Sequence, residues 1–228
     1  MRYVVGIGGL KRAGKDTFAR VLREVAVERG FAFVSVAFAD PLRQAAAAAY
    51  GVEVGDFTDD AKKDTVCPEW GITYRQMLIN LGVPATLLGG DHDHWVKRWR
   101  IEVQKTRVPW WGLTGNGEQV DLVLAVPDVR RLNEAAAIHD AGGVNVLVQR
   151  PGVEWNGHVT ELLAETSREY GQRSYADLSL FSELKQGTWH PADPRRDVFD
   201  AGIDNDGDVA ALRPRAERVL DMVLKGAK

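Results

Sequence analysis

The sequence predicts an α/β fold in which a central parallel sheet lies between two layers of helices. Strand-like and helix-like segments alternate along the 228 residues, which is typical of parallel sheets built from βαβ units. Residues 120–126 form a nearly continuous apolar run, as expected of a strand that is buried on both faces. A glycine-rich loop between the first strand and the first helix adds a phosphate-binding turn to this fold.

Each strand is expected from an apolar, β-branched or aromatic run that stops at a polar or turn residue. The second run stops at Asp40-Pro41, the third at Pro127 and the fourth before Arg150. Strands are therefore expected at residues 3–7, 31–38, 120–126, 144–148 and 198–203.

Helices are expected where apolar residues recur at helical spacing or where alanine predominates. The first helix places Phe18, Val21, Leu22 and Val25 on one face. Gly51 and Gly82 are expected to end the second and third helices. The expected helices are residues 17–28, 42–50, 74–81, 93–106, 133–141, 159–170, 175–184 and 209–224. Residues 51–71 and 107–119 are expected to form loops, the second as a loop or a hairpin.

Composition excludes several classes of protein. The net charge of −3 provides no global basic field for binding nucleic acid. No apolar run is long enough to cross a membrane, and no signal peptide is expected at the N-terminus. The single cysteine, Cys67, excludes an internal disulfide, suits the cytoplasm and is interpreted as a structural or incidental thiol.

The loop after the first strand has the spacing G-x-x-x-x-G-K from Gly9 to Lys15. Glycines let several backbone N–H groups point at one anion, the helix N-terminus adds positive potential, and the lysine reaches the outer phosphates. The alternative is an ordinary glycine-rich turn with a solvated lysine. The residues expected to bind the phosphates of a ligand are Gly9, Lys11, Arg12, Ala13, Gly14, Lys15, Asp16 and Thr17.

Asp16 stands where Ser or Thr usually follows the lysine, and Thr17 comes one place later. Asp16 is a candidate for the coordination shell of Mg²⁺, a role that Thr17 could share. The alternative is an acidic residue favoured by the helix dipole.

Charged residues recur where the predicted strands end. Asp40 and Arg43 follow the second strand, Asp128 and Arg130 the third, and Arg150 the fourth. Ligands of open α/β sheets bind at the carboxyl ends of the strands. Phosphoryl transfer needs such cations and carboxylates, and Asp128 resembles the Walker B acid that reaches magnesium. The alternatives are solvated arginines and an aspartate that caps the next helix.

Together these segments resemble the phage-type deoxynucleoside monophosphate kinases, whose phosphate loop ends in the characteristic G-K-D-T found here at residues 14–17. The other similar segments are residues 38–42, 73–82, 128–135, 148–152 with His158 and Glu161, and 203–207.

The resemblance implies a single P-loop kinase domain over residues 1–228, with an acceptor-binding helical region at 42–106 and a lid-like region at 150–199. It implies transfer of the γ-phosphate of ATP to a deoxynucleoside 5′-monophosphate, with Mg²⁺. The expected catalytic residues are Lys15, Asp128, Arg130 and Arg150, and the expected metal ligands are Asp16 and Asp128. The expected acceptor-binding residues are Asp40, Arg43, Trp70, Arg75, Gln76, Arg130 and Glu134.

Two other functions remain open from the residues alone. One is a P-loop kinase of another small phosphorylated metabolite. The other is a nucleotide-binding switch or assembly protein, for which GTP is disfavoured because no Asn-Lys-x-Asp signature is present. The expected partner is a small nucleotide substrate. The expected location is the cytoplasm, that of a host cell if the chain is phage-encoded. The oligomeric state stays open, and a homodimer is one possibility.

Overall fold

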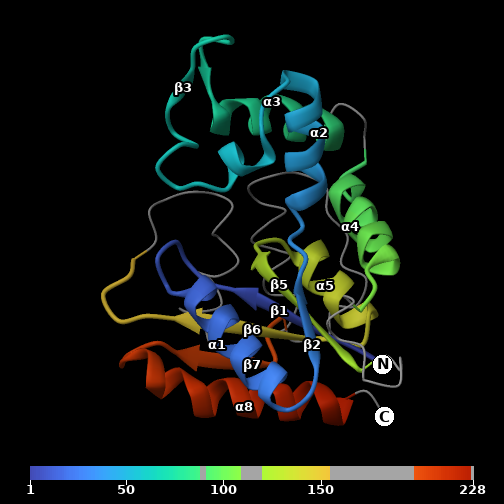
Figure 1. Cartoon of the computed structure of the whole chain (residues 1–228), viewed down its shortest axis with the longest axis vertical. Coiled ribbons are helices and arrows are strands. Elements are labelled where there is room, and N and C mark those ends of the chain that lie inside the picture. The colour runs from blue at the N-terminus through green and yellow to red at the C-terminus, as the bar shows by residue number, and fades with distance from the viewer. Residues whose placement is uncertain (88–90, 109–119, 155–197, 227–228) are drawn as a thin grey trace. The chain divides into compact units, whose positions relative to one another are not determined.

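A computed structural model describes residues 1–87, 91–108, 120–154 and 198–226 (Figure 1). The chain divides into two compact units, the first made of Met1–Val36 with Arg107–Lys228 and the second of Ala37–Thr106. The expected helices at 159–170 and 175–184, His158, Glu161, most of the lid-like region and residues 109–119 of the second expected loop lie outside the described residues.

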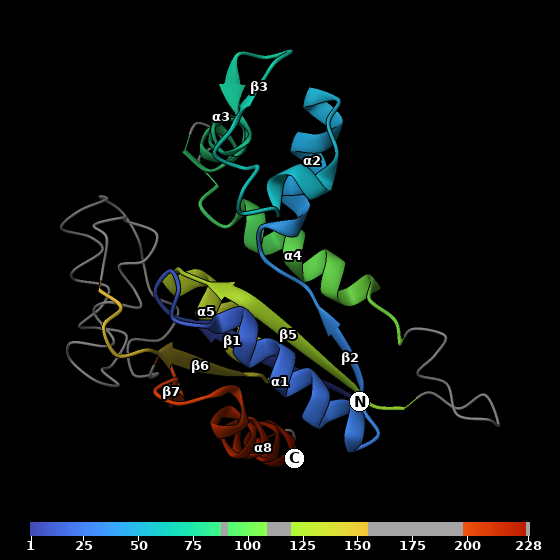
Figure 2. The same cartoon turned by 60° about the vertical axis from the view of Figure 1, so that its left-hand side comes forward.

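The first unit is built on a five-stranded sheet in the order β2-β5-β1-β6-β7, with each strand parallel to its neighbours. The strands are β1 (Arg2–Gly8), β2 (Ala32–Ser35), β5 (Leu122–Val129), β6 (Val144–Gln149) and β7 (Ala201–Asp204). Helices α1 (Lys15–Glu28) and α8 (Val209–Gly226) pack together on one face, and α5 (Leu132–Asp140) lies on the other (Figures 1 and 2). The predicted three-layer α/β fold is therefore confirmed.

The core of the first unit lies on both faces of the sheet. Residues 122–126 of β5 are all buried, because α1 and α5 cover opposite faces of the sheet around this strand. The predicted apolar face of α1, with Phe18 and Leu22 at its centre, is buried as well. Leu220 of α8 and Ile138 of α5 contribute to the two helical layers.

The expected end of the 120–126 strand is wrong. β5 begins at Leu122 and continues through Pro127 to Val129. The register against β1 shifts at this point, from Gly6 opposite Val126 to Gly8 opposite Val129. A proline lacks the N–H that a regular ladder needs, and the irregularity accommodates it. Asp128 therefore lies within the last residues of the strand rather than after it.

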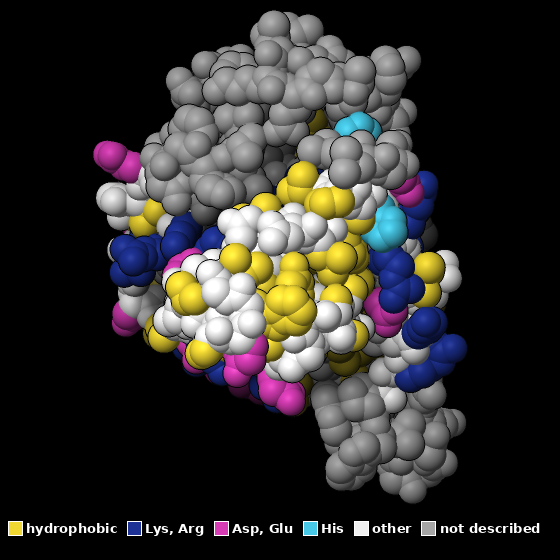
Figure 3. Space-filling model, turned by 90° about the horizontal axis from the view of Figure 1, so that it is seen from above, with side chains coloured by type: hydrophobic (Ala, Val, Ile, Leu, Met, Phe, Trp, Pro, Cys, Tyr) yellow, Lys and Arg dark blue, Asp and Glu magenta, His cyan; other side chains and the backbone are white. Residues whose placement is uncertain are grey.

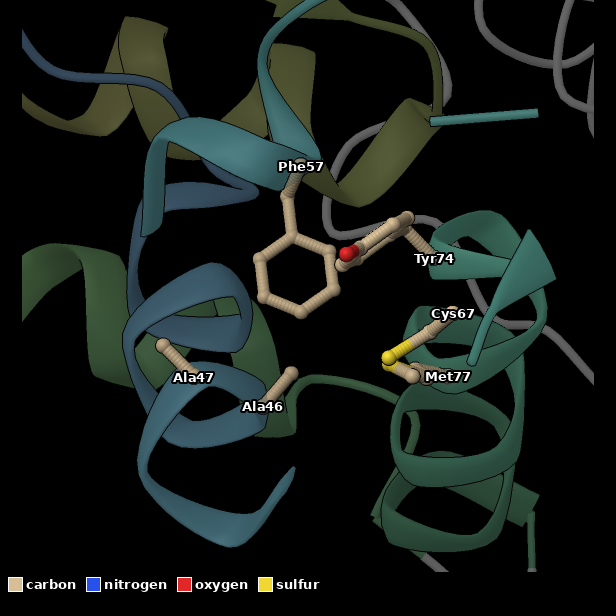
Figure 4. Close-up of a cluster of buried hydrophobic side chains, with 6 residues drawn as sticks. All are labelled: Ala46, Ala47, Phe57, Cys67, Tyr74 and Met77. Carbon is tan, nitrogen blue, oxygen red and sulfur yellow. The ribbon is translucent and has the colours of Figure 1, made fainter. Parts of the chain in front are cut away.

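In the residues that the structure describes, the second unit contains three α-helices, a 3₁₀ turn and a small hairpin. They are α2 (Asp40–Tyr50), η1 (Val54–Phe57), β3 (Val66–Cys67), β4 (Ile72–Thr73), α3 (Tyr74–Leu87) and α4 (His94–Lys105). A buried cluster joins α2, η1, β3 and α3 through Ala46, Ala47, Phe57, Cys67, Tyr74 and Met77 (Figure 4). The burial of Cys67 fits a structural thiol, and Val96 and Trp99 of α4 are also buried, as expected of packing residues.

Three expectations from the sequence, two in the second unit and one in the first, differ from the structure. The third helix does not stop at Gly82 but continues through Gly82 and Pro84 to Leu87. A Cβ at Gly82 would lie 2.9 Å from Leu42 of α2, so this glycine permits close helix packing instead of ending the helix. The loop at 51–71 contains η1 and β3. The strand at 31–38 is limited to β2, which pairs with β5 over only four residues.

Candidate active site

The backbone of the loop between β1 and α1 adopts conformations that favour glycine. Gly9 has φ 145° and Gly14 has φ 96°, and Arg12 is left-handed with φ 68°. The N–H of Ala13 donates to the carbonyl of Leu10 at 3.1 Å and closes the turn. When residues with positive and negative φ follow one another in a loop, successive backbone N–H groups can turn toward a common point and form an anion-binding concavity. The glycines of the motif therefore stand where the backbone requires them.

Lys15 lies across this loop. Its Nζ donates to the carbonyl oxygens of Gly9 at 2.8 Å and Leu10 at 2.9 Å. Gly14 is the N-cap of α1 and provides no side-chain cap, so the positive end of the helix opens onto the same loop. The structure thus brings an ammonium group and a helix N-terminus together, as a phosphate site requires.

The other predicted ATP-binding residues differ in exposure. Lys11, Arg12 and Asp16 are exposed, Thr17 is partly buried, and Ala13 is buried. Asp16 stands in the first turn of α1. The two loop cations can therefore reach a ligand in solvent, and Ala13 can contribute only through its backbone.

The end of β5 adjoins the loop because Val129 pairs with Gly8. Here Glu134 of α5 accepts hydrogen bonds from the backbone N–H groups of Arg130 at 2.7 Å and Arg131 at 3.0 Å. Its side chain is partly exposed, but its carboxylate lies against the backbone of the turn. Burial of that carboxylate and the nearby charge of Asp128 raise the pKa of Glu134 to about 7. Two carboxylates and an exposed arginine, Arg130, therefore gather beside the phosphate loop.

The residues around Asp128 suit magnesium in one respect. No group of three or more His, Cys, Asp or Glu side chains that could hold a metal occurs within the described ranges. Mg²⁺ commonly uses one or two carboxylates, with waters and substrate phosphates completing its shell. Asp128 precedes Val129, which pairs with Gly8, so its carboxylate could provide such a ligand, and Asp16 stands in the first turn of α1.

A small pocket opens at the carboxyl end of β6. It is lined by Leu10, Ala13, Leu147, Val148, Gln149, Arg150 and Val153. The structure therefore brings Arg150, which is exposed, to the same edge of the sheet as the phosphate loop. The surrounding side chains are mostly apolar, and the pocket is far smaller than a typical ligand site.

The sequence did not predict two contacts, one with the loop and one with the last residue of β1. The side-chain amide of Asn205 donates to the carbonyl of Ala13 at 2.8 Å, across 192 positions of sequence. A Cβ at Gly8 would lie 2.5 Å from the ring of Phe199. Residues 203–207 belong to the resemblance, and residues 204–208 are interpreted from the sequence as a turn before the final helix, near the nucleotide base. No local pattern links Asn205 or Phe199 to the loop.

The remaining predicted acceptor residues belong to the second unit. Asp40 and Arg43 are brought together in an ion pair of 2.8 Å at the start of α2. Arg75 donates to Asp64 from Nε at 2.5 Å and from Nη2 at 3.1 Å. Both arginines are thus held in place by carboxylates of their own unit.

Trp70 and Gln76 have contacts of their own in this unit. Trp70 donates from Nε1 to the carbonyl of Tyr50 at 2.9 Å and packs edge-on against the Tyr50 ring, yet half of its surface is exposed. Gln76 donates to Asn80 one turn further along α3. Figure 3 shows hydrophobic side chains exposed among polar ones on the described surface. Among the described residues of the second unit, the large exposed apolar residues are Val54, Val66, Trp70, Ile79, Val83 and Ile101.

No protein-family model matches the chain, and no curated protein sequence matches it either. Several solved structures are similar. An APS kinase from Mycobacterium tuberculosis, in complex with AMPPNP and APS, has 15% identity and a TM-score of 0.41, with 98% of this chain and 97% of that chain covered. A gluconokinase from Sinorhizobium meliloti has 14% identity and a TM-score of 0.39, with 99% and 95% covered. A dephospho-CoA kinase from Campylobacter jejuni has 15% identity and a TM-score of 0.37, with both chains fully covered at 100%.

These similar structures are kinases with different substrates, and likeness at this level assigns none of those substrates to the present chain. Of the described helices, none has the length and apolar character needed to span a bilayer.

Proposed function

We propose that this chain transfers the γ-phosphate of ATP to a deoxynucleoside 5′-monophosphate, with Mg²⁺, and forms ADP and the deoxynucleoside diphosphate. The observation that carries the proposal is the conformation of the loop between β1 and α1. The Lys15 ammonium group donates hydrogen bonds to two carbonyl oxygens of this loop. A cation, curled backbone and a helix N-terminus at one point favour the binding of a polyphosphate. This loop therefore supports a nucleoside triphosphate as the donor.

The residues beside the loop support transfer as well as binding. Phosphoryl transfer asks a protein mainly to align two substrates and to balance the charge on the moving group. Lys15 and the loop N–H groups would hold the outer phosphates of ATP, while Arg130 and Arg150 would balance transferring charge. Asp128 would hold Mg²⁺, which would supply positive charge to offset the negative charge of the phosphates.

The acceptor is proposed from the resemblance of residues 38–42, 73–82 and 128–135 to the phage-type kinases. In this proposal Arg43 and Arg75 bind the acceptor phosphate, with Asp40 and Gln76 as polar contacts and Trp70 as a platform for the base. The half-exposed side chain of Trp70 supports that role, since its hydrogen bond to the carbonyl of Tyr50 holds the ring while half of its surface stays exposed.

A coupled assay of ADP formation tests the proposal. Purified protein is supplied with ATP and Mg²⁺ and with a panel of deoxynucleoside and ribonucleoside monophosphates. ADP is expected only when a deoxynucleotide acceptor is present. Turnover only with other phosphorylated metabolites would show that the acceptor is not a deoxynucleotide. ATP binding without any turnover would favour a nucleotide-dependent switch.

The variant Lys15→Ala tests the donor site in the same assay. Loss of the ammonium group should lower turnover by roughly 100-fold or more, in the range seen when one transition-state donor is removed. Lys225→Ala is the matched control, because Lys225 is an exposed lysine at the end of α8 in the same unit. Retained activity in Lys15→Ala would contradict the assignment of the phosphate loop.

A further inference from the structure

Asn205 contacts the phosphate loop from the opposite end of the chain. It follows β7 directly, is almost fully buried, and donates from its side-chain amide to the carbonyl of Ala13 at 2.8 Å. Ala13 and Gly14 are the last two loop residues before Lys15. The hydrogen bond therefore contacts the peptide group between Ala13 and Gly14, directly before the first residue of α1.

The orientation of that peptide group follows from its geometry. No cis peptide bond occurs among the described residues. In a trans peptide group the C=O and the N–H point in opposite directions. Because the carbonyl of Ala13 is directed to Asn205, the N–H of Gly14 is directed away from it. The carbonyl that accepts from Asn205 and the N–H of Gly14 thus belong to one peptide group and point in opposite directions.

Asn205 is held firmly in this position. Its backbone N–H donates to the carbonyl of Gln149 at 2.6 Å, at the end of β6. The next residue, Asp206, pairs with Arg215 of α8 at 2.9 Å. A Cβ at Gly14 would lie 2.2 Å from the amide nitrogen of Asn205, so the amide occupies the space beside this glycine. The side chain therefore has little freedom to leave the loop.

We propose that Asn205 is a positioning residue of the phosphate loop, which turns the N–H of Gly14 toward the phosphates of the bound nucleotide. The inference rests on the proposed phosphate-binding function of the loop. It makes the loop depend on a residue of the C-terminal segment. Loss of the amide would leave the loop residues in place but would release one of the donors that bind the polyphosphate.

Binding of inorganic tripolyphosphate and of ATP by calorimetry tests this proposal, since tripolyphosphate contains only the phosphate part. Asn205→Ala removes the donor, and Asn205→Asp replaces it with an acceptor of the same shape. Both should weaken binding of each probe by about tenfold, the size of one hydrogen bond to a charged group. Asp206→Asn is the control, because it changes the neighbouring ion pair and leaves the amide of Asn205 unchanged.

A second measurement separates orientation from general stability. Labelling with ¹³C-carbonyl alanine and ¹⁵N-glycine selects Ala-Gly pairs, which occur at 13–14, 141–142 and 201–202. The Gly14 amide signal should shift on addition of tripolyphosphate to the unsubstituted protein and stay unshifted in Asn205→Ala, and the other two signals serve as references.

Equal affinity in the Asn205 variants and the unsubstituted protein, with the Gly14 shift retained, would overturn the role of Asn205 and leave the proposed function intact. Failure of the unsubstituted protein to bind either probe would contradict the proposed function and this inference together.

Discussion

Glu134 accepts a hydrogen bond of 2.7 Å from the backbone N–H of Arg130. A second bond, from Arg131, holds the same oxygen, so one carboxylate of α5 fixes the turn that leaves β5. The side chain of Arg130 remains exposed beside the phosphate loop. The direct role expected for Glu134 in acceptor binding stays a prediction, but the structure assigns it a local role in shaping the turn.

The raised pKa of Glu134 predicts a pH-dependent stability. Its pKa is about 7 in the folded protein, against an ordinary value of 4.5. Between these values the folded state holds a proton that the unfolded state releases, so the stabilisation from this group is complete below pH 4.5 and lost as pH rises to about 7. The loss approaches about 1.4 kcal/mol per pH unit.

Urea unfolding at several pH values between 5 and 8 measures this effect. Glu134→Gln keeps a neutral acceptor and should lack the dependence. The free energy of unfolding of the unsubstituted protein should therefore fall relative to that of Glu134→Gln as pH rises. Parallel pH profiles for the two proteins would show that the carboxylate titrates normally.

Gly9 and Gly30 form a matched pair for testing the loop backbone. A Cβ at Gly9 would lie 2.4 Å from the carbonyl oxygen of Val148, whereas a Cβ at Gly30 would meet nothing within 4 Å. Both glycines have positive φ, 145° and 83°. Gly30→Ala should cost about 1–2 kcal/mol from backbone strain alone, and Gly9→Ala should cost clearly more. Thermal unfolding compares the stability of the two variants. Equal losses of stability would show that the backbone at Val148 shifts at little cost to accommodate the new Cβ.

Arg75 provides a test of acceptor binding in the second unit. If it binds the acceptor phosphate, Arg75→Ala should raise the acceptor KM by roughly tenfold or more, as expected for loss of a charged hydrogen bond, with the ATP KM unchanged. Arg98→Ala is the control, since Arg98 also pairs with a carboxylate of this unit, Glu102. Steady-state kinetics with each substrate varied in turn measures both KM values. An unchanged acceptor KM in Arg75→Ala would contradict the assignment of Arg75 to the acceptor site.

Asp128 provides a test of the metal. Replacing its carboxylate by an amide in Asp128→Asn should raise the Mg²⁺ concentration needed for half-maximal activity by about tenfold, because a hard cation prefers a charged oxygen ligand. Asp140→Asn, at the exposed end of α5, is the matched control. Superimposable Mg²⁺ titrations for all three proteins would remove Asp128 from the metal site.

Sequence reasoning worked best where a local pattern had one physical cause. The apolar face of α1 and the buried run of β5 both follow from residue periodicity and burial. It failed where a punctuating residue had a tertiary use. Gly82 lies within α3 because it packs closely against Leu42, and Pro127 lies within β5 because the ladder is irregular there. The same residue types usually end such elements.

The sequence by itself determined the alternation of strands and helices and the glycine-rich loop before α1, because both depend on residues that are near neighbours in the chain. Only the tertiary structure decided the strand order, the contact of Glu134 with its turn and the hydrogen bond from Asn205 to Ala13. That bond joins residues 192 positions apart. Such pairs form when helices and strands pack to bury apolar surface, and no local spacing records them.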